Sequence, residues 1–259
     1  MTGRWAWLVV VLVGLVACAG AEPAPEAPME PPATLGVPDP EAPIRVLFVG
    51  NSYTFSHDLP RVLEQIAAAT PEGPAIKTKM VAEPGWTLQQ HWEDRRALAE
   101  IRGGSYQWVV LQGHSLSTVE ARERLIEYGR RFDSAIDEAG AQTVLFQTWA
   151  RRERPEMLED VRVGYGALAA HTGAVVVPVG EAWAESWAAH PDIHLWHADG
   201  SHPSPAGTYL GAAAFYSAIT RRSSVGADHA GFGQLDADEI RVLQEIGAKT
   251  SINAVPPPR

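Results

Sequence analysis

The stretch from Ile44 to Ser52, IRVLFVGNS, constrains the fold of this 259-residue chain more than any other segment. Up to the glycine it is apolar apart from Arg45, which is typical of a central strand in a parallel sheet whose two faces are covered. Gly50, Asn51 and Ser52 then place a hydroxyl on a tight turn at the carboxyl end of the strand, where open α/β sheets collect ligands. Ser52 is therefore a candidate nucleophile. The alternative is a solvated loop serine, since Gly and Asn are ordinary turn residues.

Strand-like and helix-like segments alternate from this point onward. Strands are predicted over 44–49, 75–81, 108–111, 142–148 and 174–179. Helices are predicted from 59 to about 67, from the turn at 84–85 to about 101, and over 119–139, 155–170, 204–219 and 236–246. This alternation predicts an α/β domain with a parallel, doubly wound sheet and right-handed crossovers.

The first 18 residues have the pattern of an export signal. Arg4 precedes an apolar run that is too short to cross a bilayer comfortably, and small residues close the segment. The ending Leu-Val-Ala-Cys resembles a bacterial lipoprotein signal, which implies cleavage and lipidation at Cys18, the only cysteine. The alternatives are an uncleaved anchor or a simple secretion signal. We expect a lipid-anchored protein of the bacterial cell envelope, on the periplasmic or extracellular face of a membrane, with no disulfide and no catalytic thiol.

The rest of the chain divides into three parts that differ in composition. Residues 19–43 are rich in Pro, Ala and Glu without apolar periodicity, which predicts a disordered tether. A folded domain is expected over 44–222 and a tail with one helix over 223–259. The chain has 21 basic and 31 acidic side chains, a net charge of −10. This charge argues against nucleic acid or an anionic membrane surface as a partner, so the membrane is expected to be reached only through the lipid.

The second informative stretch is 194–205, HLWHADGSHPSP. Asp199 and His202 stand three residues apart in a loop dense in Gly, Ser and Pro, just before a predicted helix. This spacing lets the carboxylate accept a hydrogen bond from Nδ1 of the imidazole while Nε2 acts as a general base. With Ser52, these residues supply the parts of a catalytic triad. The alternative is a turn at Asp199 and an ordinary loop histidine.

Taken together, these stretches resemble the SGNH, or GDSL-like, hydrolases over most of residues 44–220. The motifs that carry the resemblance are Val49-Gly50-Asn51-Ser52 for the nucleophile block, Glu83-Pro84-Gly85-Trp86 for the oxyanion glycine, and Asp199-Gly200-Ser201-His202 for the last block. Asn51 stands where many members have Asp. The resemblance implies a flavodoxin-like, three-layer α/β/α fold around a central parallel sheet, and ester hydrolysis by Ser52, His202 and Asp199.

The third block departs from the family pattern. Where the family generally has Gly-x-Asn-Asp, this chain has Gln112-Gly113-His114-Ser115, so the asparagine that completes the oxyanion hole is missing. Gln-Gly-Glu variants occur in carbohydrate-esterase branches of the family, which favours Gln112 as the side-chain donor. His114, at the asparagine position by simple counting, is the alternative. The expected oxyanion hole comprises the amides of Ser52 and Gly85 and one of these two side chains.

Two other kinds of site, an α/β-hydrolase nucleophile elbow and a metal site, fit this sequence less well. The α/β-hydrolase elbow requires Gly-x-Ser-x-Gly, and Thr54 occupies the last position. His194, His197, Asp199 and His202 are ligand types found at metal sites, but their spacing follows no zinc pattern and two of them already have a role in the triad. We therefore expect neither a metal nor a cofactor, and loop positions near the cleft for His194 and His197.

Tryptophans indicate the substrate class. Trp86, Trp92, Trp149 and Trp196 fall near strand ends or loops on the expected active-site edge, where an indole can stack on a sugar; burial is the alternative for each. We expect Trp86, Trp149 and Trp196, together with Asn51, to bind substrate. An aromatic cleft on an exported lipoprotein favours acylated carbohydrate over lipid. The sequence thus predicts a serine esterase that removes acetyl or other short acyl groups from carbohydrate, with a catalytically silent carbohydrate-binding lipoprotein as the alternative.

Overall fold

The computed structural model describes residues 42–227, 234–252 and 254. The expected signal peptide, Cys18 and the tether up to residue 41 lie outside these ranges, so those expectations remain predictions. Across the described ranges, no helix combines the length and the apolar character that a membrane span requires.

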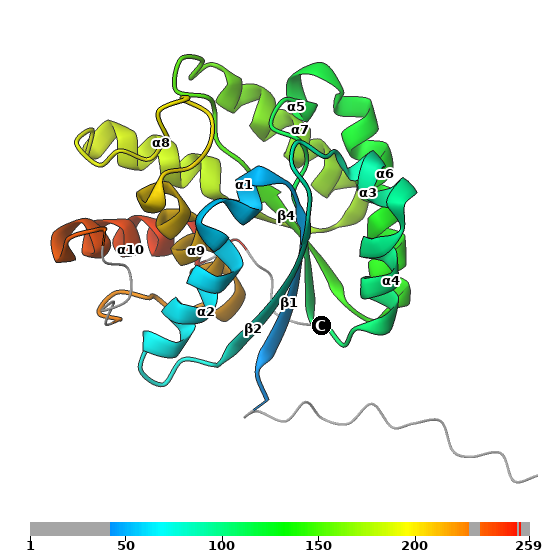
Figure 1. Cartoon of the computed structure of the whole chain (residues 1–259), viewed down its shortest axis with the longest axis horizontal. Coiled ribbons are helices and arrows are strands. Elements are labelled where there is room, and N and C mark those ends of the chain that lie inside the picture. The colour runs from blue at the N-terminus through cyan, green and yellow to red at the C-terminus, as the bar shows by residue number, and fades with distance from the viewer. Residues whose placement is uncertain (1–41, 228–233, 253, 255–259) are drawn as a thin grey trace, which may run out of the picture. The chain divides into compact units, whose positions relative to one another are not determined.

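Five parallel strands form one sheet in the order β2-β1-β3-β4-β5 (Figure 1). Their bounds are β1 Ile44–Gly50, β2 Ile76–Ala82, β3 Trp108–Leu111, β4 Gln142–Gln147 and β5 Val175–Pro178. Val49 of β1 lies in register with Val81 of β2 and with Leu111 of β3. The chain leaves β1 toward β2 on one side and later returns to β3 on the other, so the carboxyl end of β1 is a topological switch point.

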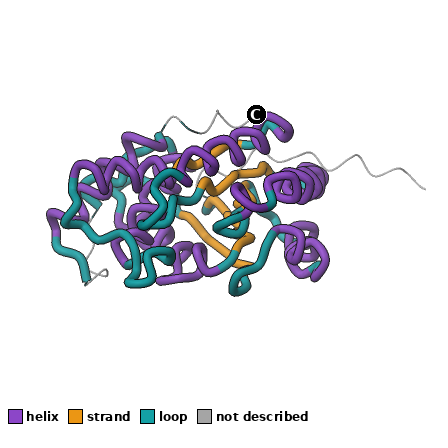
Figure 2. The backbone as a smooth tube through the Cα atoms, turned by 90° about the horizontal axis from the view of Figure 1, so that it is seen from above, coloured by secondary structure: helices purple, strands orange, loops and turns teal. Residues whose placement is uncertain are grey.

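Helices cover both faces of this sheet, with the strands between them (Figures 1 and 2). Their bounds are α1 Ser52–Phe55, the 3₁₀ turn η1 Ser56–Asp58, α2 Leu59–Ala69, α3 Leu88–Asp94, α4 Arg96–Gly103, α5 Ser117–Glu120, α6 Arg122–Glu138, α7 Met157–Thr172, α8 Val179–Ala189, α9 Pro205–Thr220 and α10 Ala237–Ser251. The predicted three-layer α/β/α architecture around a parallel sheet is therefore confirmed.

The two faces of β1 supply two separate cores, because successive strand residues point to opposite sides of a sheet. Val46 and Phe48 join the core formed with α2, α8, α9 and α10. Leu47 and Val49 join the core formed with α3, α4, α6 and α7. With both faces covered, β1 needs the nearly continuous apolar run that its sequence has.

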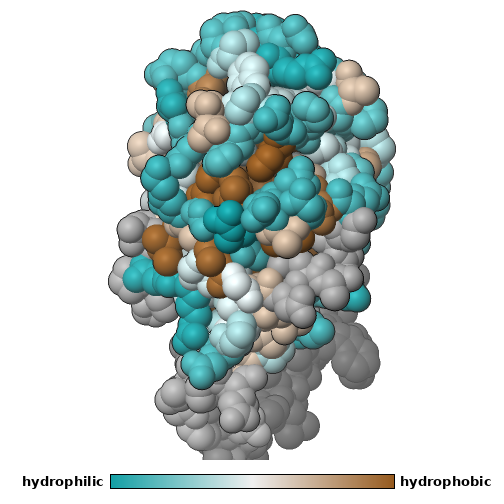
Figure 3. Space-filling model, turned by 90° about the vertical axis from the view of Figure 1, so that its left-hand side faces the viewer, coloured by the Kyte–Doolittle hydropathy of each residue, from teal (hydrophilic) through white to brown (hydrophobic). Residues whose placement is uncertain are grey.

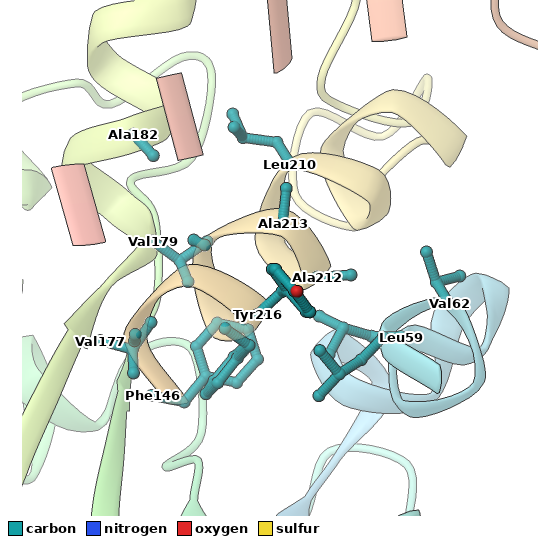
Figure 4. Packing of buried hydrophobic residues seen from close by; sticks show 14 of the residues in the cluster. Leu59, Val62, Phe146, Val177, Val179, Ala182, Leu210, Ala212, Ala213 and Tyr216 are labelled. Atoms are coloured by element: carbon teal, nitrogen blue, oxygen red, sulfur yellow. The ribbon is translucent and has the colours of Figure 1, made fainter. Parts of the chain in front are cut away.

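Helix α9 is buried along nearly its whole length. Figure 4 shows its Leu210, Ala213 and Tyr216 between α2 and the residues of β4, β5 and α8. Helix α10, predicted in the tail without a function, packs against α9 through Leu243 and Ile246. In Figure 3, which views the left-hand side of Figure 1, hydrophilic residues surround smaller areas of hydrophobic ones.

Two helical predictions were wrong in detail, and one helix was not predicted. The helix expected to run to 101 is two helices, because Arg95 takes a left-handed φ of 73° between α3 and α4. The helix expected over 119–139 is likewise divided at Ala121 into α5 and α6. Helix α8 was not predicted. It follows β5 directly after Pro178, with no side-chain cap that marks a helix start.

Candidate active site

The turn after β1 places Ser52 at the first position of α1. Asn51 caps that helix, since its Oδ1 accepts a hydrogen bond from the Tyr53 amide at 3.1 Å. The Ser52 amide is one of the donors that a helix start leaves without an intrahelical partner, and it donates to no other described residue. The nucleophile block thus presents both a hydroxyl and a free N–H at the carboxyl edge of the sheet.

The structure brings Ser52, His202 and Asp199 together as the sequence predicts. Nε2 of His202 lies 2.9 Å from Oγ of Ser52, and Nδ1 of His202 lies 2.6 Å from Oδ2 of Asp199. Because the carboxylate only accepts, Nδ1 carries the proton and Nε2 is left to accept from the serine hydroxyl. The geometry is that of a nucleophile, a base and a group that orients the base.

The carboxylate of Asp199 is held in its charged form. Its Oδ1 accepts hydrogen bonds from the amides of Ser201 and His202, both at 2.9 Å. Burial alone would raise the pKa of Asp199, but the hydrogen bond from the His202 ring and those from the two amides outweigh it and hold the pKa well below its usual range. Asp199 therefore stays ionised through mildly acidic pH.

Aromatic side chains hold the loop that carries Asp199 and His202. The Tyr53 hydroxyl lies 2.7 Å from Oγ of Ser201, and the Tyr53 ring meets the His202 ring edge-on with centroids 5.8 Å apart. Trp149 stacks on Tyr53 with centroids 4.5 Å apart and donates from Nε1 to the Ser201 carbonyl at 3.0 Å. Trp149 is only 2% exposed. The expectation that it stacks on a sugar is therefore wrong, because its ring is used inside the protein.

Gly85 stands beside this centre because β2 is the neighbour of β1. The Glu83 amide donates to the Gly50 carbonyl at 3.2 Å, which extends the pairing of the two strands into their loops. Gly85 has a left-handed φ of 69°, a conformation that favours glycine. Its amide makes no hydrogen bond to any residue in the described ranges. The Gly85 amide is thus free to donate, and its role in an oxyanion hole stays a prediction.

The side chain of Gln112 is engaged within the protein. Its Oε1 accepts from the Asn51 amide at 2.8 Å and from Oγ1 of Thr54 at 3.0 Å. Its Nε2 donates to the Gly113 carbonyl, and the side chain is 0% exposed. Gln112 therefore braces the turn that bears Ser52, a structural role that the sequence did not predict; its expected role as an oxyanion donor stays a prediction, which its complete burial disfavours.

Asn51 is likewise a structural residue. It is 2% exposed, its Oδ1 caps α1, and its Nδ2 donates to the carbonyls of Trp86 at 2.9 Å and Gly113 at 3.4 Å. Each of its side-chain atoms is used to join the loops after β1, β2 and β3. The expectation that Asn51 binds substrate is wrong for this reason.

His114 keeps a donor available. Its Nδ1 accepts from the Leu116 amide at 3.3 Å, so the proton of the neutral ring sits on Nε2. Burial lowers the pKa of His114, and the nearby Arg151 guanidinium lowers it further, which favours the neutral ring. Of the two candidate donors in the third block, His114 is the one that is partly exposed and whose Nε2–H makes no hydrogen bond to a described residue.

The sequence did not reveal His91. This histidine on α3 is fully buried, and its Nε2 donates to the Gly50 carbonyl at 2.7 Å. Burial lowers its pKa, and Nδ1 has no hydrogen-bond partner among the residues described. The only signal in the sequence is a polar residue on the inward face of a predicted helix, which does not say what it bonds.

The remaining tryptophans of the set are less buried than Trp149. Trp86 is half-buried beside Gly85, and Trp196 is half-buried with its Nε1 donating to the Ala150 carbonyl at 3.1 Å. Trp92 lies on α3 and packs edge-on against Phe132 of α6, with centroids 5.3 Å apart. Trp86 and Trp196 are thus the two half-buried tryptophans of this set that lie outside the helices. Their rings also have neighbours within the protein, since Trp86 meets His91 edge-on at 5.0 Å and Trp196 meets Trp183 and Trp187 edge-on at 5.1 Å each.

The histidines of the loop 194–205 are the candidate metal ligands of the sequence. His194 and His197 are exposed, and His197 approaches Asp199 only to 3.7 Å. Within the described ranges, no group of three or more His, Cys, Asp or Glu side chains is arranged to hold a metal ion.

Comparison with solved structures identifies the fold. A protein from Slackia heliotrinireducens described as a candidate SGNH hydrolase is 25% identical, with a TM-score of 0.58 over 69% of this chain and 100% of that chain. A DUF4886 family protein from Bacteroides uniformis is 17% identical, with a TM-score of 0.63 over 80% of this chain and 94% of its own. A catalytic mutant of Axe2, an acetylxylan esterase from Geobacillus stearothermophilus, is 17% identical, with a TM-score of 0.50 over 68% and 94% of the two chains. No family model and no curated protein matches the chain. The chain therefore has the fold of the SGNH hydrolases.

Proposed function

We propose that this protein is a serine esterase of the SGNH type. The observation that carries the proposal is the pair of contacts that join Oγ of Ser52 to Nε2 of His202, at 2.9 Å, and Nδ1 of His202 to the Asp199 carboxylate, at 2.6 Å. The similarity in fold to SGNH hydrolases supports the same activity. A catalytically silent binding protein has no need for a serine, a base and a carboxylate at these distances.

In the proposed reaction, Oγ of Ser52 attacks the acyl carbonyl while Nε2 of His202 takes the serine proton. The same proton then goes to the departing alcohol, which leaves an acyl-serine. His202 next removes a proton from water, and the resulting attack releases the acid and restores the serine. Asp199 keeps the imidazole oriented and stabilises its charged form in both steps.

The negative charge on the carbonyl oxygen needs donors that are fixed before the reaction. The free amides of Ser52 and Gly85 are two candidates, at the ends of neighbouring strands. We propose Nε2–H of His114 as the third, because Gln112 uses its amide within the protein. A neutral His114 donates without adding a titrating charge to the site.

For the substrate, we propose an acetyl or other short acyl ester of a carbohydrate. Axe2, which shares the fold, is an acetylxylan esterase. The partly exposed indoles of Trp86 and Trp196 near the catalytic loops suit a sugar ring better than a flexible acyl chain. The experiment is a turnover screen with aryl acetate, butyrate and octanoate esters, followed by acetylated oligosaccharides.

Ser52→Ala tests the nucleophile, and Ser56→Ala is the matched control in the turn that directly follows α1. We expect Ser52→Ala to abolish turnover without a change in melting temperature, and Ser56→Ala to retain it. More than a few per cent of wild-type turnover in Ser52→Ala contradicts the serine mechanism. If the wild-type protein binds acylated oligosaccharide and hydrolyses none of the esters, the silent binding protein is the correct function.

Chelation tests the assignment of Asp199 and His202. With these residues as orienter and base, exhaustive treatment with a chelator leaves the rate unchanged. A rate that is lost with the chelator and restored by Zn²⁺ reassigns both residues to a metal.

We also propose that the protein is anchored in the bacterial cell envelope through lipid on Cys18. Several acyl chains on one lipoprotein anchor give stable attachment where one chain is marginal. Cys18→Ser is expected to move the protein from the membrane fraction to the soluble fraction. If the variant stays wholly with membranes, the apolar run before Cys18 is an uncleaved anchor.

A further inference from the structure

Arg151 lies in the loop after β4, at the carboxyl edge of the sheet that also holds Ser52. Its side chain is half-buried, and its Nη2 donates to Oγ of Ser115 at 3.3 Å. Its Nε is buried and makes no hydrogen bond to any described residue. Part of the guanidinium has therefore left water without a replacement partner, which is unfavourable unless a ligand supplies one.

Arg151 also forms no ion pair with any carboxylate among the residues that the structure describes. The acidic side chains nearest in sequence are used by other arginines: Arg152 pairs with Glu153 at 3.2 Å, and Arg154 pairs with Glu156 at 3.4 Å. An arginine that is partly buried at the edge of a catalytic centre without a carboxylate differs from these exposed neighbours. Its positive charge is available to an anion from outside.

Two groups of the catalytic edge lie within the electrostatic reach of Arg151. Burial raises the pKa of Tyr53, and the guanidinium of Arg151 is one of the groups that oppose the rise, through its charge and through a side-chain hydrogen bond to Tyr53. Arg151 also helps to lower the pKa of His114. Since Tyr53 follows Ser52 directly and contacts Ser201, the charge of Arg151 acts on the residue next to the proposed nucleophile.

We infer that Arg151 binds a carboxylate of the substrate, so that this esterase selects acyl esters that carry an acidic group close to the ester bond. The guanidinium presents a rigid fork of N–H donors that matches a carboxylate in two parallel hydrogen bonds. The inference rests on the proposed function. The carboxylate has two possible sources, an acidic sugar ring or a dicarboxylic acyl group, and both present the same chemistry to Arg151.

Matched pairs of esters test the inference. Acetylated methyl glucuronoside is compared with acetylated methyl glucoside, and the mono-aryl ester of succinic acid is compared with the aryl butyrate. For the wild-type protein we expect kcat/KM to be about 10- to 100-fold higher on the acidic member of at least one pair, as charge-assisted hydrogen bonds predict. The pair that shows the preference identifies the source of the carboxylate.

Arg151→Gln is expected to remove the preference through KM on the acidic member, and Arg151→Lys to restore part of it. Arg154→Gln, an exposed arginine of the same loop, is the control and keeps the preference. If Arg151→Gln lowers kcat equally on both members, the residue serves the oxyanion or the loop, and the inference is overturned. A wild-type ratio of one or below in both pairs overturns it without any variant.

The same data separate this inference from the proposed function. If no ester is hydrolysed, the esterase proposal fails. If the neutral esters are hydrolysed and the acidic ones are not preferred, the esterase proposal stands and only the role of Arg151 is rejected.

Discussion

Replacement of Gln112 by alanine tests how the nucleophile is held. The substitution removes three hydrogen bonds, to the Asn51 amide, to Oγ1 of Thr54 and to the Gly113 carbonyl, from a side chain with no exposed surface. At about 1 kcal/mol for each bond, with a small addition for the cavity, we expect the free energy of unfolding to fall by about 3 to 4 kcal/mol. For a domain of this size, that corresponds to a melting temperature lower by about 6 to 16 °C.

The same substitution is expected to lower kcat. Without Gln112, the Asn51 amide loses its acceptor, and Ser52 is no longer fixed relative to His202. A small displacement of a reacting group can cost about 10²-fold in rate, so we expect a kcat defect of about 10- to 100-fold with little change in KM. Both changes follow from one cause, the loosening of the turn.

Gln147→Ala is the matched control. Gln147 is also a buried glutamine at the carboxyl end of a strand, but its amide donates at 3.4 Å to Glu181, away from the Ser52 turn. This control should lose some stability and keep its kcat. The assay is kcat and KM on one acetyl ester, well below the lowest melting temperature, together with that temperature for each variant. If Gln112→Ala melts within about 2 °C of the wild type while kcat falls about 100-fold, Gln112 donates to the oxyanion and our reasoning is refuted.

Asp199→Asn should lower kcat by about 10³- to 10⁴-fold, because the base loses its orienting acceptor. Since the folded-state pKa of Asp199 is depressed, its stabilising effect should be constant from pH 7 to about 5 and shrink only as the pH falls below about 4; melting of wild type and variant across this range checks the sign. His91→Leu, which removes the donor to the Gly50 carbonyl, should lower kcat about 10-fold at nearly constant KM; an unchanged kcat shows that the bond is dispensable. Gly50→Ala places a Cβ 2.5 Å from Oγ1 of Thr54 and 2.6 Å from Oε1 of Gln112, so circular dichroism should show a protein that melts about 10 °C lower or fails to fold. A melting temperature equal to that of the wild type contradicts this packing.

The sequence predicted the features that depend on local signals. Each of the five strands was predicted within a few residues, because buried parallel strands are short apolar runs bounded by turn residues. The approach of Asp199 and His202 to Ser52 was also predicted. Asp199 and His202 are three positions apart in one loop, between α8 and α9, and Ser52 stands where β1 ends at the carboxyl edge of the sheet.

The features that depend on which atoms meet across the fold were not predicted. Gln112 ends a buried strand with an amide, and the chain alone does not say whether that amide faces the cleft or the neighbouring loop. Trp149 and Trp196 have the same residue type and similar loop positions, yet only Trp149 is fully covered by its neighbours. Helix α8 escaped prediction because it lacks both an N-terminal cap and a connecting loop.

The third block of this chain, Gln112-Gly113-His114-Ser115, helps to support the turn that carries Ser52. Gln112, Asn51 and His91 each direct a polar side chain at the backbone between Gly50 and Tyr53 or at the loops beside it. These bonds use the buried side-chain donors of the region on carbonyls of the protein, while the Ser52 amide stays without a partner among the described residues. An oxyanion hole must be rigid before charge develops in it. We therefore argue that the polar groups most deeply buried at this edge act by keeping the Ser52 hydroxyl and amide in place, which is why we propose the less buried His114 as the side-chain donor of the oxyanion hole.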